Sequence, residues 1–178
     1  MAQGRPKLKS PQSIGLADAQ VMAFYEPDPG RYLVEFTAPP VYQPADEEAE
    51  TSERFTFKLR ILEAELEDES AEDPTGRTWT YSIFIPAPGD EDDEDNSSSR
   101  WRRMALSQVK SIFEAAGVKV SKDKSGYDIW DPDEFVGKHS RLVCKYVIDR
   151  ESGEIRKNSR GRPLKNYYFY KAPQEDAE

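Results

Sequence analysis

The stretch Arg54-Phe-Thr-Phe-Lys-Leu-Arg-Ile-Leu62 decides the fold class, because apolar and polar residues alternate along it without a break. In an extended chain the apolar side chains fall on one side: Phe55, Phe57, Leu59 and Ile61. The polar side chains fall on the other: Thr56, Lys58 and Arg60. This alternation is typical of a strand that is buried on one face only. The sequence therefore predicts a β-strand whose solvent face is cationic.

Four more segments carry strand signals, and each is bounded by residues that favour turns. They are 31–37, 77–85, 139–149 and 163–171. In the segment 77–85, Trp79 and Tyr81 share a face with Ile83, so each of these two rings is either a core residue or an exposed one. In the last segment, alternation places half of Tyr167, Tyr168, Phe169 and Tyr170 inside without indicating which half.

One helix is predicted between the third and fourth strands. Apolar residues recur there at helical spacing: Trp101, Ala105, Val109, Ile112, Phe113 and Ala116. Gly117 is placed to end the helix. The apolar stripe predicts packing against a sheet, so we assign Trp101 to the core, with base stacking as the less favoured alternative.

The order of elements is strand, strand, strand, helix, strand, strand. It predicts a mainly β fold, a five-stranded Greek-key barrel of the oligonucleotide/oligosaccharide-binding (OB) type with one α-helix between strands 3 and 4. A closed barrel hides its strand edges, and the helix would cover one open end. The domain is expected to span residues 29–172, after a partly ordered leader (1–28) and before an acidic tail (173–178).

Charge is segregated along the chain, which carries a formal net charge of −9 over 178 residues. Acidic residues gather in 46–53, 63–73 and 90–95 and in the tail, whereas basic residues outnumber acidic ones between Lys138 and Lys171. A polyanion is then repelled by most of the surface and attracted to one basic groove. We expect the acidic tail to compete for that groove, which would sharpen the salt dependence of binding.

The single cysteine, Cys144, lies inside a strand-like run and is predicted to be a buried thiol, as in a reducing compartment. No apolar stretch approaches the ~18 residues that span a bilayer. We expect a cytoplasmic protein without membrane association.

Signatures of catalysis are missing from the sequence. There is one histidine, His139, and neither a phosphate-binding glycine loop nor a nucleophile elbow. The run Asp90–Asp95 has no ligand framework for a metal. We therefore predict a protein that is not an enzyme and has no cofactor or metal, with a metal-dependent nuclease as a distant alternative.

Residue types suited to single-stranded nucleic acid are present, because such a ligand needs cations for its phosphates and flat rings for its bases. The predicted phosphate contacts are Lys58, Arg60, Arg77 and four residues of a long basic hairpin between the last two strands, Arg156, Lys157, Arg160 and Arg162. The candidate stacking platforms are Trp79, Tyr81, Phe84, Tyr146, Tyr167 and Tyr168.

Several segments resemble the single-stranded-DNA-binding proteins encoded by bacteriophages. They are Pro29-Gly-Arg-Tyr-Leu-Val-Glu-Phe36, Phe113-Glu-Ala-Ala-Gly117, Asp133-Glu-Phe-Val-Gly-Lys138 and Leu164-Lys-Asn-Tyr-Tyr-Phe-Tyr170. The resemblance covers residues 29–172 and implies a protein that coats single-stranded DNA during replication or recombination. It also implies an acidic tail that contacts replication or recombination proteins, and a possible homo-oligomer.

The main alternative belongs to a different class. An acidic OB-like module could act by protein interaction, in viral assembly or as a host inhibitor whose acidic loops mimic nucleic acid. Salt-sensitive binding of an oligonucleotide distinguishes the two interpretations.

Overall fold

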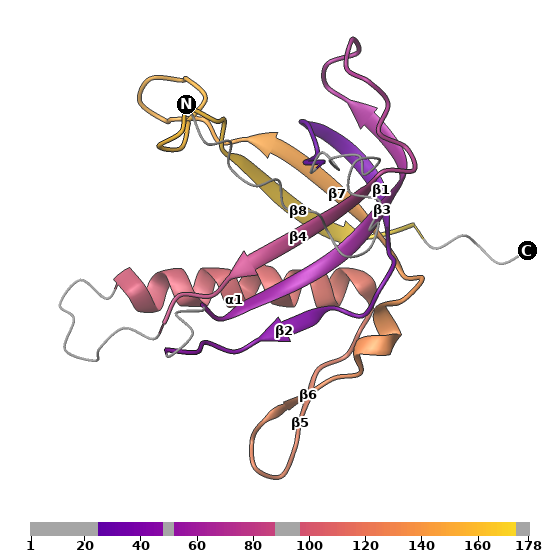
Figure 1. The fold of residues 1–178 in the computed structure, drawn as a ribbon, viewed down its shortest axis with the longest axis vertical. Helices are drawn as coiled ribbons and strands as arrows, with labels where there is room; N and C mark the ends of the chain where they lie inside the picture. Colours follow the sequence, from indigo (N-terminus) through magenta and orange to yellow (C-terminus); the bar gives the residue numbers. More distant parts are fainter. Residues whose placement is uncertain (1–24, 48–51, 88–96, 174–178) are drawn as a thin grey trace, which may run out of the picture.

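The computed structural model describes residues 25–47, 52–87 and 97–173, and a curled antiparallel sheet dominates it (Figure 1). The predictions for the first 24 residues, for the acidic run Asp90–Asp95 and for the tail beyond Pro173 lie outside these ranges. The elements in chain order are β1 (Gly30–Phe36), β2 (Val41–Gln43), β3 (Arg54–Leu66), β4 (Thr78–Phe84), α1 (Ser97–Ala116), β5 (Ser121–Lys122), β6 (Asp128–Ile129), the 3₁₀ helix η1 (Pro132–Phe135), β7 (His139–Tyr146) and β8 (Lys165–Lys171).

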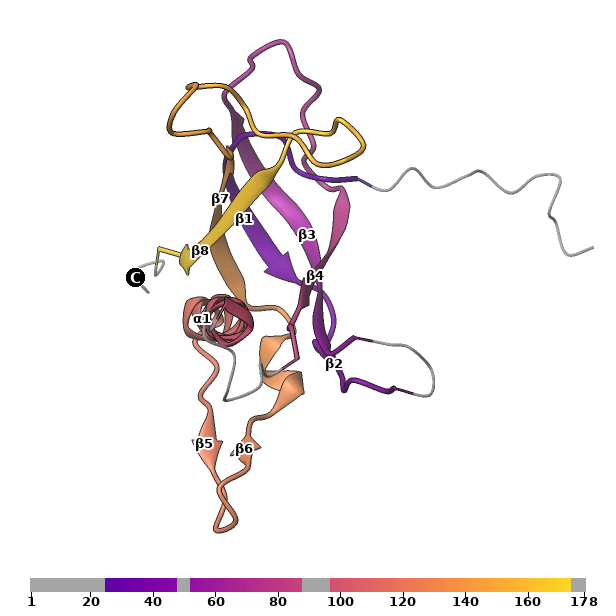
Figure 2. The same ribbon diagram turned by 90° about the vertical axis from the view of Figure 1, so that its left-hand side faces the viewer.

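The sheet has the order β2-β3-β1-β7-β8, and β4 pairs with the other edge of β3. The long strand β3 pairs with β4 through its first half and with β1 through its second half. The sheet curls into a half-barrel, which brings β4 near β8 although the two strands are not paired (Figure 2). Only side chains meet there: the rings of Trp79 and Tyr167 have centroids 4.8 Å apart. We call this junction the seam.

The predicted mainly β fold with one α-helix is confirmed for the described part of the chain. All five predicted strands are present, and β3 runs four residues past its predicted end, to Leu66. The sequence did not predict β2, η1 or the small β5–β6 hairpin, which projects from the body (Figures 1 and 2).

The alternation in β3 divides its two faces as expected. Phe57, Leu59 and Ile61 are buried, whereas Lys58 and Arg60 are exposed. The inward side chains of β1, β7 and β8 complete this core: Tyr32, Val34, Phe36, Leu142, Cys144 and Phe169.

Helix α1 packs mainly against β8, and Val109, Ile112 and Phe113 are buried as predicted. The helix ends before Gly117, whose φ of +73° favours glycine. Trp101 corrects our prediction: its side chain is 58% exposed, so it is not a core residue. Among the residues that the structure describes, no helix is both long and apolar enough to cross a membrane.

Residues outside the five main strands close the two ends of the sheet. At the end of β1, Phe135 of η1 is fully buried and its ring lies 5.2 Å from that of Phe36 and 4.8 Å from that of Phe113. At the start of β1, residues 25–29 cross the opposite end, and we call them the strap.

Four side chains of the sheet hold the strap, and one of them is Tyr32 of β1, whose hydroxyl donates a hydrogen bond to the carbonyl oxygen of Asp28. Tyr167 Oη donates a hydrogen bond to Glu26 (2.7 Å), and Lys165 Nζ donates one to the carbonyl oxygen of Pro27 (2.8 Å). The Cys144 thiol contacts the same carbonyl oxygen (3.5 Å). Cys144 is a buried thiol as predicted, and burial raises its pKa to about 12.

Candidate nucleic-acid interface

A groove of about 910 Å³ lies along the seam. Its walls come from three elements: residues 81–84 of β4, residues 166–170 of β8, and the side of α1 that includes Trp101 and Gln108. The groove lies where two edge strands of the curled sheet, β4 and β8, come close without pairing, and α1 packs against both of them.

Aromatic rings form the floor of the groove. Tyr81 lies 5.2 Å from Tyr167 and stacks 5.8 Å from Phe169, measured between ring centroids. Gln108 Nε2 of α1 donates a hydrogen bond to Tyr81 Oη. Burial raises the pKa of Tyr81 and of Tyr167 far above neutral, so both hydroxyl groups stay protonated. The floor is therefore uncharged and tightly packed.

Four large rings stand exposed at the rim of the groove. Phe84 comes from β4, Trp101 from α1, and Tyr168 and Tyr170 from β8, and their exposed fractions are 59%, 58%, 44% and 53%. Exposed rings at the edge of a concave surface can stack on unpaired bases, because every base has a flat π face.

Cationic side chains flank the groove on both sides, one strand away. On one side, Lys58 of β3 lies opposite Thr80 of β4. On the other side, Arg141 and Lys145 of β7 lie opposite Tyr170 and Asn166 of β8. Directly opposite residues share a face of the sheet and neighbouring strands lie about 4.8 Å apart, so these charges border the rim.

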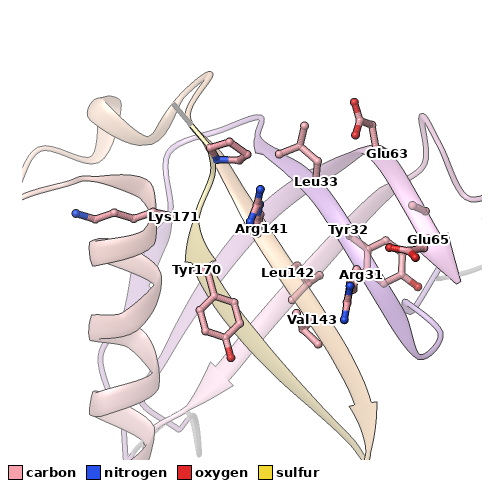
Figure 3. A pocket seen from close by; sticks show the side chains of 12 residues that line it. Arg31, Tyr32, Leu33, Glu63, Glu65, Arg141, Leu142, Val143, Tyr170 and Lys171 are labelled. Atoms are coloured by element: carbon pink, nitrogen blue, oxygen red, sulfur yellow. The ribbon is translucent and has the colours of Figure 1, made fainter. Parts of the chain in front are cut away.

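A second hollow, of about 630 Å³, lies on the outer face of β1, β3, β7 and β8 (Figure 3). Arg31 and Arg141 line it together with Glu63 and Glu65, above apolar residues such as Val143. Tyr170 lines both this hollow and the groove. The two depressions therefore lie next to each other, on either side of Tyr170.

The predicted cations of β3 and β4 differ in their partners. Lys58 is exposed and forms no ion pair with any residue of the described ranges. Arg60 forms a salt bridge with Glu35 of β1. Arg77 forms one with Glu72, and its guanidinium lies 5.4 Å from the centre of the Tyr25 ring. Lys58 is thus the freest of these three charges.

The connection between β7 and β8 is not the single long hairpin that we predicted. It contains two tight turns, marked by the bridges Ile148↔Ile155 and Lys157↔Pro163. In the first turn, the backbone N–H groups of Ser152 and Glu151 bond to Asp149 and lower the pKa of its carboxyl group.

The second turn is built around Asn158, whose Oδ1 accepts hydrogen bonds from the backbone N–H groups of Arg160 and Arg162. The four predicted cations of this connection are exposed: Arg156, Lys157, Arg160 and Arg162. They form no ion pair within the part of the chain that is described, and they lie at the end of the sheet opposite α1 (Figure 2). The structure thus separates them from the helix end of the groove.

The predicted platforms separate by burial. Trp79 is 5% exposed and its ring packs between Tyr81 and Tyr167, so it belongs to the core and we leave it out of the interface. Tyr146 is half-buried at the end of β7. Phe84 and Tyr168 are at the rim, and Tyr81 and Tyr167 are in the floor.

Sequence reasoning did not assign several residues of this surface to the site. They are Arg31, Trp101, Arg141, Lys145 and Tyr170. Alternation from Tyr168 gave a signal for Tyr170, because residues two apart in a strand share a face. Trp101 is exposed because the sheet is open at the seam, and this opening forms only when the strands come together in the folded protein.

Within the described ranges, no group of three or more His, Cys, Asp or Glu side chains is arranged to hold a metal ion. Comparison with known proteins leaves the chain without an assigned relative: no protein-family model matches it, and no curated protein matches it significantly.

Proposed function

We propose that this protein binds single-stranded nucleic acid, and DNA in the first instance, without catalysis and with little sequence preference. The carrying observation is the arrangement along the seam, where exposed rings line a groove that has cationic strands on both sides. In this proposal, bases stack on Phe84, Tyr168 and Tyr170, and phosphates contact Lys58, Arg141 and Lys145.

The proposal includes an OB-type barrel made of β1, β3, β4, β7 and β8. The strand order β4-β3-β1-β7-β8 supports it, since this order leaves one seam for closure and has α1 between β4 and β7 in the chain. An accessory role in phage DNA replication or recombination, in the host cytoplasm, is the biological setting that we propose.

The connection between β7 and β8 contributes to the proposal through charge alone. Its exposed cations, together with Arg31 of the second hollow, would attract the backbone of a strand that extends beyond the groove. Arg60 and Arg77 contribute less, because each already has a carboxylate partner.

Fluorescence anisotropy with a labelled oligo-dT tests the function. We expect tight binding at about 50 mM salt that weakens strongly at about 200 mM, because phosphate contacts release counterions. A duplex of the same length should bind more weakly, since its bases are not available for stacking. An oligonucleotide that fails to bind even at the lower salt concentration contradicts the proposal.

One observation favours a second candidate function, a protein-interaction module. Glu63 and Glu65 of β3 and the exposed acidic residues that follow, Glu67, Asp68, Glu69, Glu72 and Asp73, concentrate negative charge in the connection between β3 and β4. Such a surface repels nucleic acid and suits a basic protein partner. In that case, oligo-dT would not bind at either salt concentration.

A further inference from the structure

Helix α1 presents three different faces. The core face contains Val109, Ile112, Phe113 and Ala116. A second face lines the groove with Trp101, Met104, Gln108 and Ser111. The third is solvent-exposed and includes Arg103 and Lys110, and Arg100 lies at the border between the second and third faces. An amphipathic helix that only covered a sheet would need the first and the third faces alone.

Trp101 is the most exposed large ring of the groove-facing side of α1. It is 58% exposed, and it lines the groove together with Phe84 of β4 and Tyr168 of β8. An exposed tryptophan loses the hydrophobic stabilisation that burial would give, about 25 cal/mol per Å² of apolar surface. Because Trp101 lines the same groove as other exposed rings, it can contact a bound ligand together with them.

The charges near Trp101 indicate an anionic ligand. Arg100 and Arg103 are exposed and form no salt bridge with any described residue, whereas Arg102 is held by Glu53 and Lys110 by Glu114. Arg100 lies one helical turn before Met104, which lines the groove, so Arg100 and Trp101 border the same side of the helix. A guanidinium and an exposed indole placed in this way suit a ligand that carries both flat rings and negative charges, which describes a nucleotide of a single strand.

We infer that α1 is one wall of the nucleic-acid site, with Trp101 as a base-stacking residue and Arg100 as a phosphate contact. This inference rests on the proposed function and adds the helix to a surface otherwise made of strands. The bound strand then crosses the seam from β8 onto the start of α1, and bases stack on Trp101 opposite Phe84.

Intrinsic fluorescence reports on this contact directly, because the three tryptophans have different environments. Trp79 is buried, and Trp130 is partly buried against Phe113 with ring centroids 5.0 Å apart. Trp101 is exposed in the groove. We expect unlabelled oligo-dT to quench the emission of the wild-type protein, and we expect no quenching in Trp101→Phe.

Affinity measured by anisotropy with labelled oligo-dT separates stacking from structural effects. Trp101→Ala should weaken binding by about 5- to 150-fold, the loss of one stacked base, and Trp101→Phe should keep most of the affinity. Leu106→Ala is the matched control, since Leu106 is an exposed residue of the same helix that does not line the groove, and its affinity should equal that of the wild type. Arg100→Ala should lower the salt slope by about 1.

The outcomes distinguish this inference from the proposed function. Normal binding by Trp101→Ala, together with unquenched wild-type emission, overturns the role of α1 and leaves the strand surface in place. Absence of any binding by the wild type overturns both. A third outcome also overturns the inference: an apolar dye quenches the emission of Trp101, but oligo-dT neither quenches this emission nor displaces the dye. The groove would then bind an apolar ligand.

Discussion

Arg141 of β7 and Tyr170 of β8 lie directly opposite each other on the outer face of the sheet. Tyr170 also belongs to the walls of both depressions, the groove at the seam and the hollow of Figure 3. A cation and an exposed ring thus stand side by side where the two depressions meet. Mutation of each residue of this pair can therefore measure the contribution of a phosphate contact and of base stacking to the affinity separately.

Arg141→Ala and Tyr170→Ala are expected to differ in their response to salt. Removal of Arg141 removes one phosphate contact, so the slope of log K against log salt should fall by about 1. Removal of Tyr170 should weaken binding by ~1 to 3 kcal/mol at every salt concentration and leave the slope unchanged. Anisotropy titrations at several salt concentrations measure both. Equal slopes for wild type and Arg141→Ala would argue against a phosphate contact there.

Glu35 is expected to restrain binding, because it neutralises Arg60. Glu35→Gln frees the guanidinium and should raise both the affinity and the salt slope, whereas Arg60→Ala should have a small effect.

Lys58→Ala should lower the slope by about 1, since Lys58 forms no salt bridge with a described residue. Replacement of both Lys58 and Arg60 should lower affinity and flatten the slope. Wild-type binding by this double variant at all salt concentrations would refute the assignment.

Deletion of residues 173–178 tests the expected competition by the acidic tail. Loss of Glu175, Asp176 and Glu178 removes negative charge that would compete with phosphate for basic side chains. The apparent affinity for oligo-dT at low salt should rise and the difference should vanish at high salt, as screening weakens the competition. Equal affinities at low salt would count against it. Replacement of the three acids by their amides is the matched control, because it keeps the length of the chain.

The free energy of unfolding is expected to fall in alkaline solution. Burial raises the pKa of Cys144 from 9.0 to about 12, and burial also raises the pKa values of Tyr32, Tyr81 and Tyr167. The unfolded chain therefore loses protons that the folded protein keeps, so this stability is fully present below about pH 9 and is lost as the pH rises toward 12.

Urea denaturation at about pH 8 and about pH 10.5 measures this effect. Cys144→Ala is the control, and it should retain the part of the fall that comes from the tyrosines. A free energy of unfolding that stays constant over this range would contradict the buried, protonated state of these groups.

Phe135→Ala is expected to destabilise the protein by about 3 to 5 kcal/mol. The ring is fully buried and contacts Phe36, Phe57 and Phe113. Urea denaturation should show a lower midpoint with a similar slope. Val136→Ala is the matched control, since Val136 is the next residue and is exposed. A similar loss in both variants would show that the backbone of η1, and not the ring, provides the stability.

The sequence predicted the long elements because their burial follows a simple period. Phe57 and Lys58 fall on opposite faces of β3 as a period of two requires, and Ile112 and Phe113 fall on the buried side of α1. The short elements were missed because two to four residues carry too little pattern. Phe135 therefore looked like part of a loop, although it is a central core residue.

The site was predictable only in its residue types. Lys58 was expected to be exposed and is, and Phe84 and Tyr168 are the two candidate platforms that the structure leaves exposed at the rim. The error at Trp101 has a physical cause: helical periodicity shows that a residue faces the body of the protein, and it does not show that the sheet is open at that point. The neutralisation of Arg60 by Glu35 depends on the pairing of β1 with β3, which joins residues far apart in the chain.

The unpaired seam has a mechanical consequence. Strand β4 forms backbone hydrogen bonds only with β3, and β8 only with β7. Side-chain packing therefore sets the distance between β4 and β8. A ligand that moves these two strands apart separates aromatic rings without breaking backbone hydrogen bonds between strands. The opening can therefore adjust its width to what it holds while the rest of the sheet keeps its register.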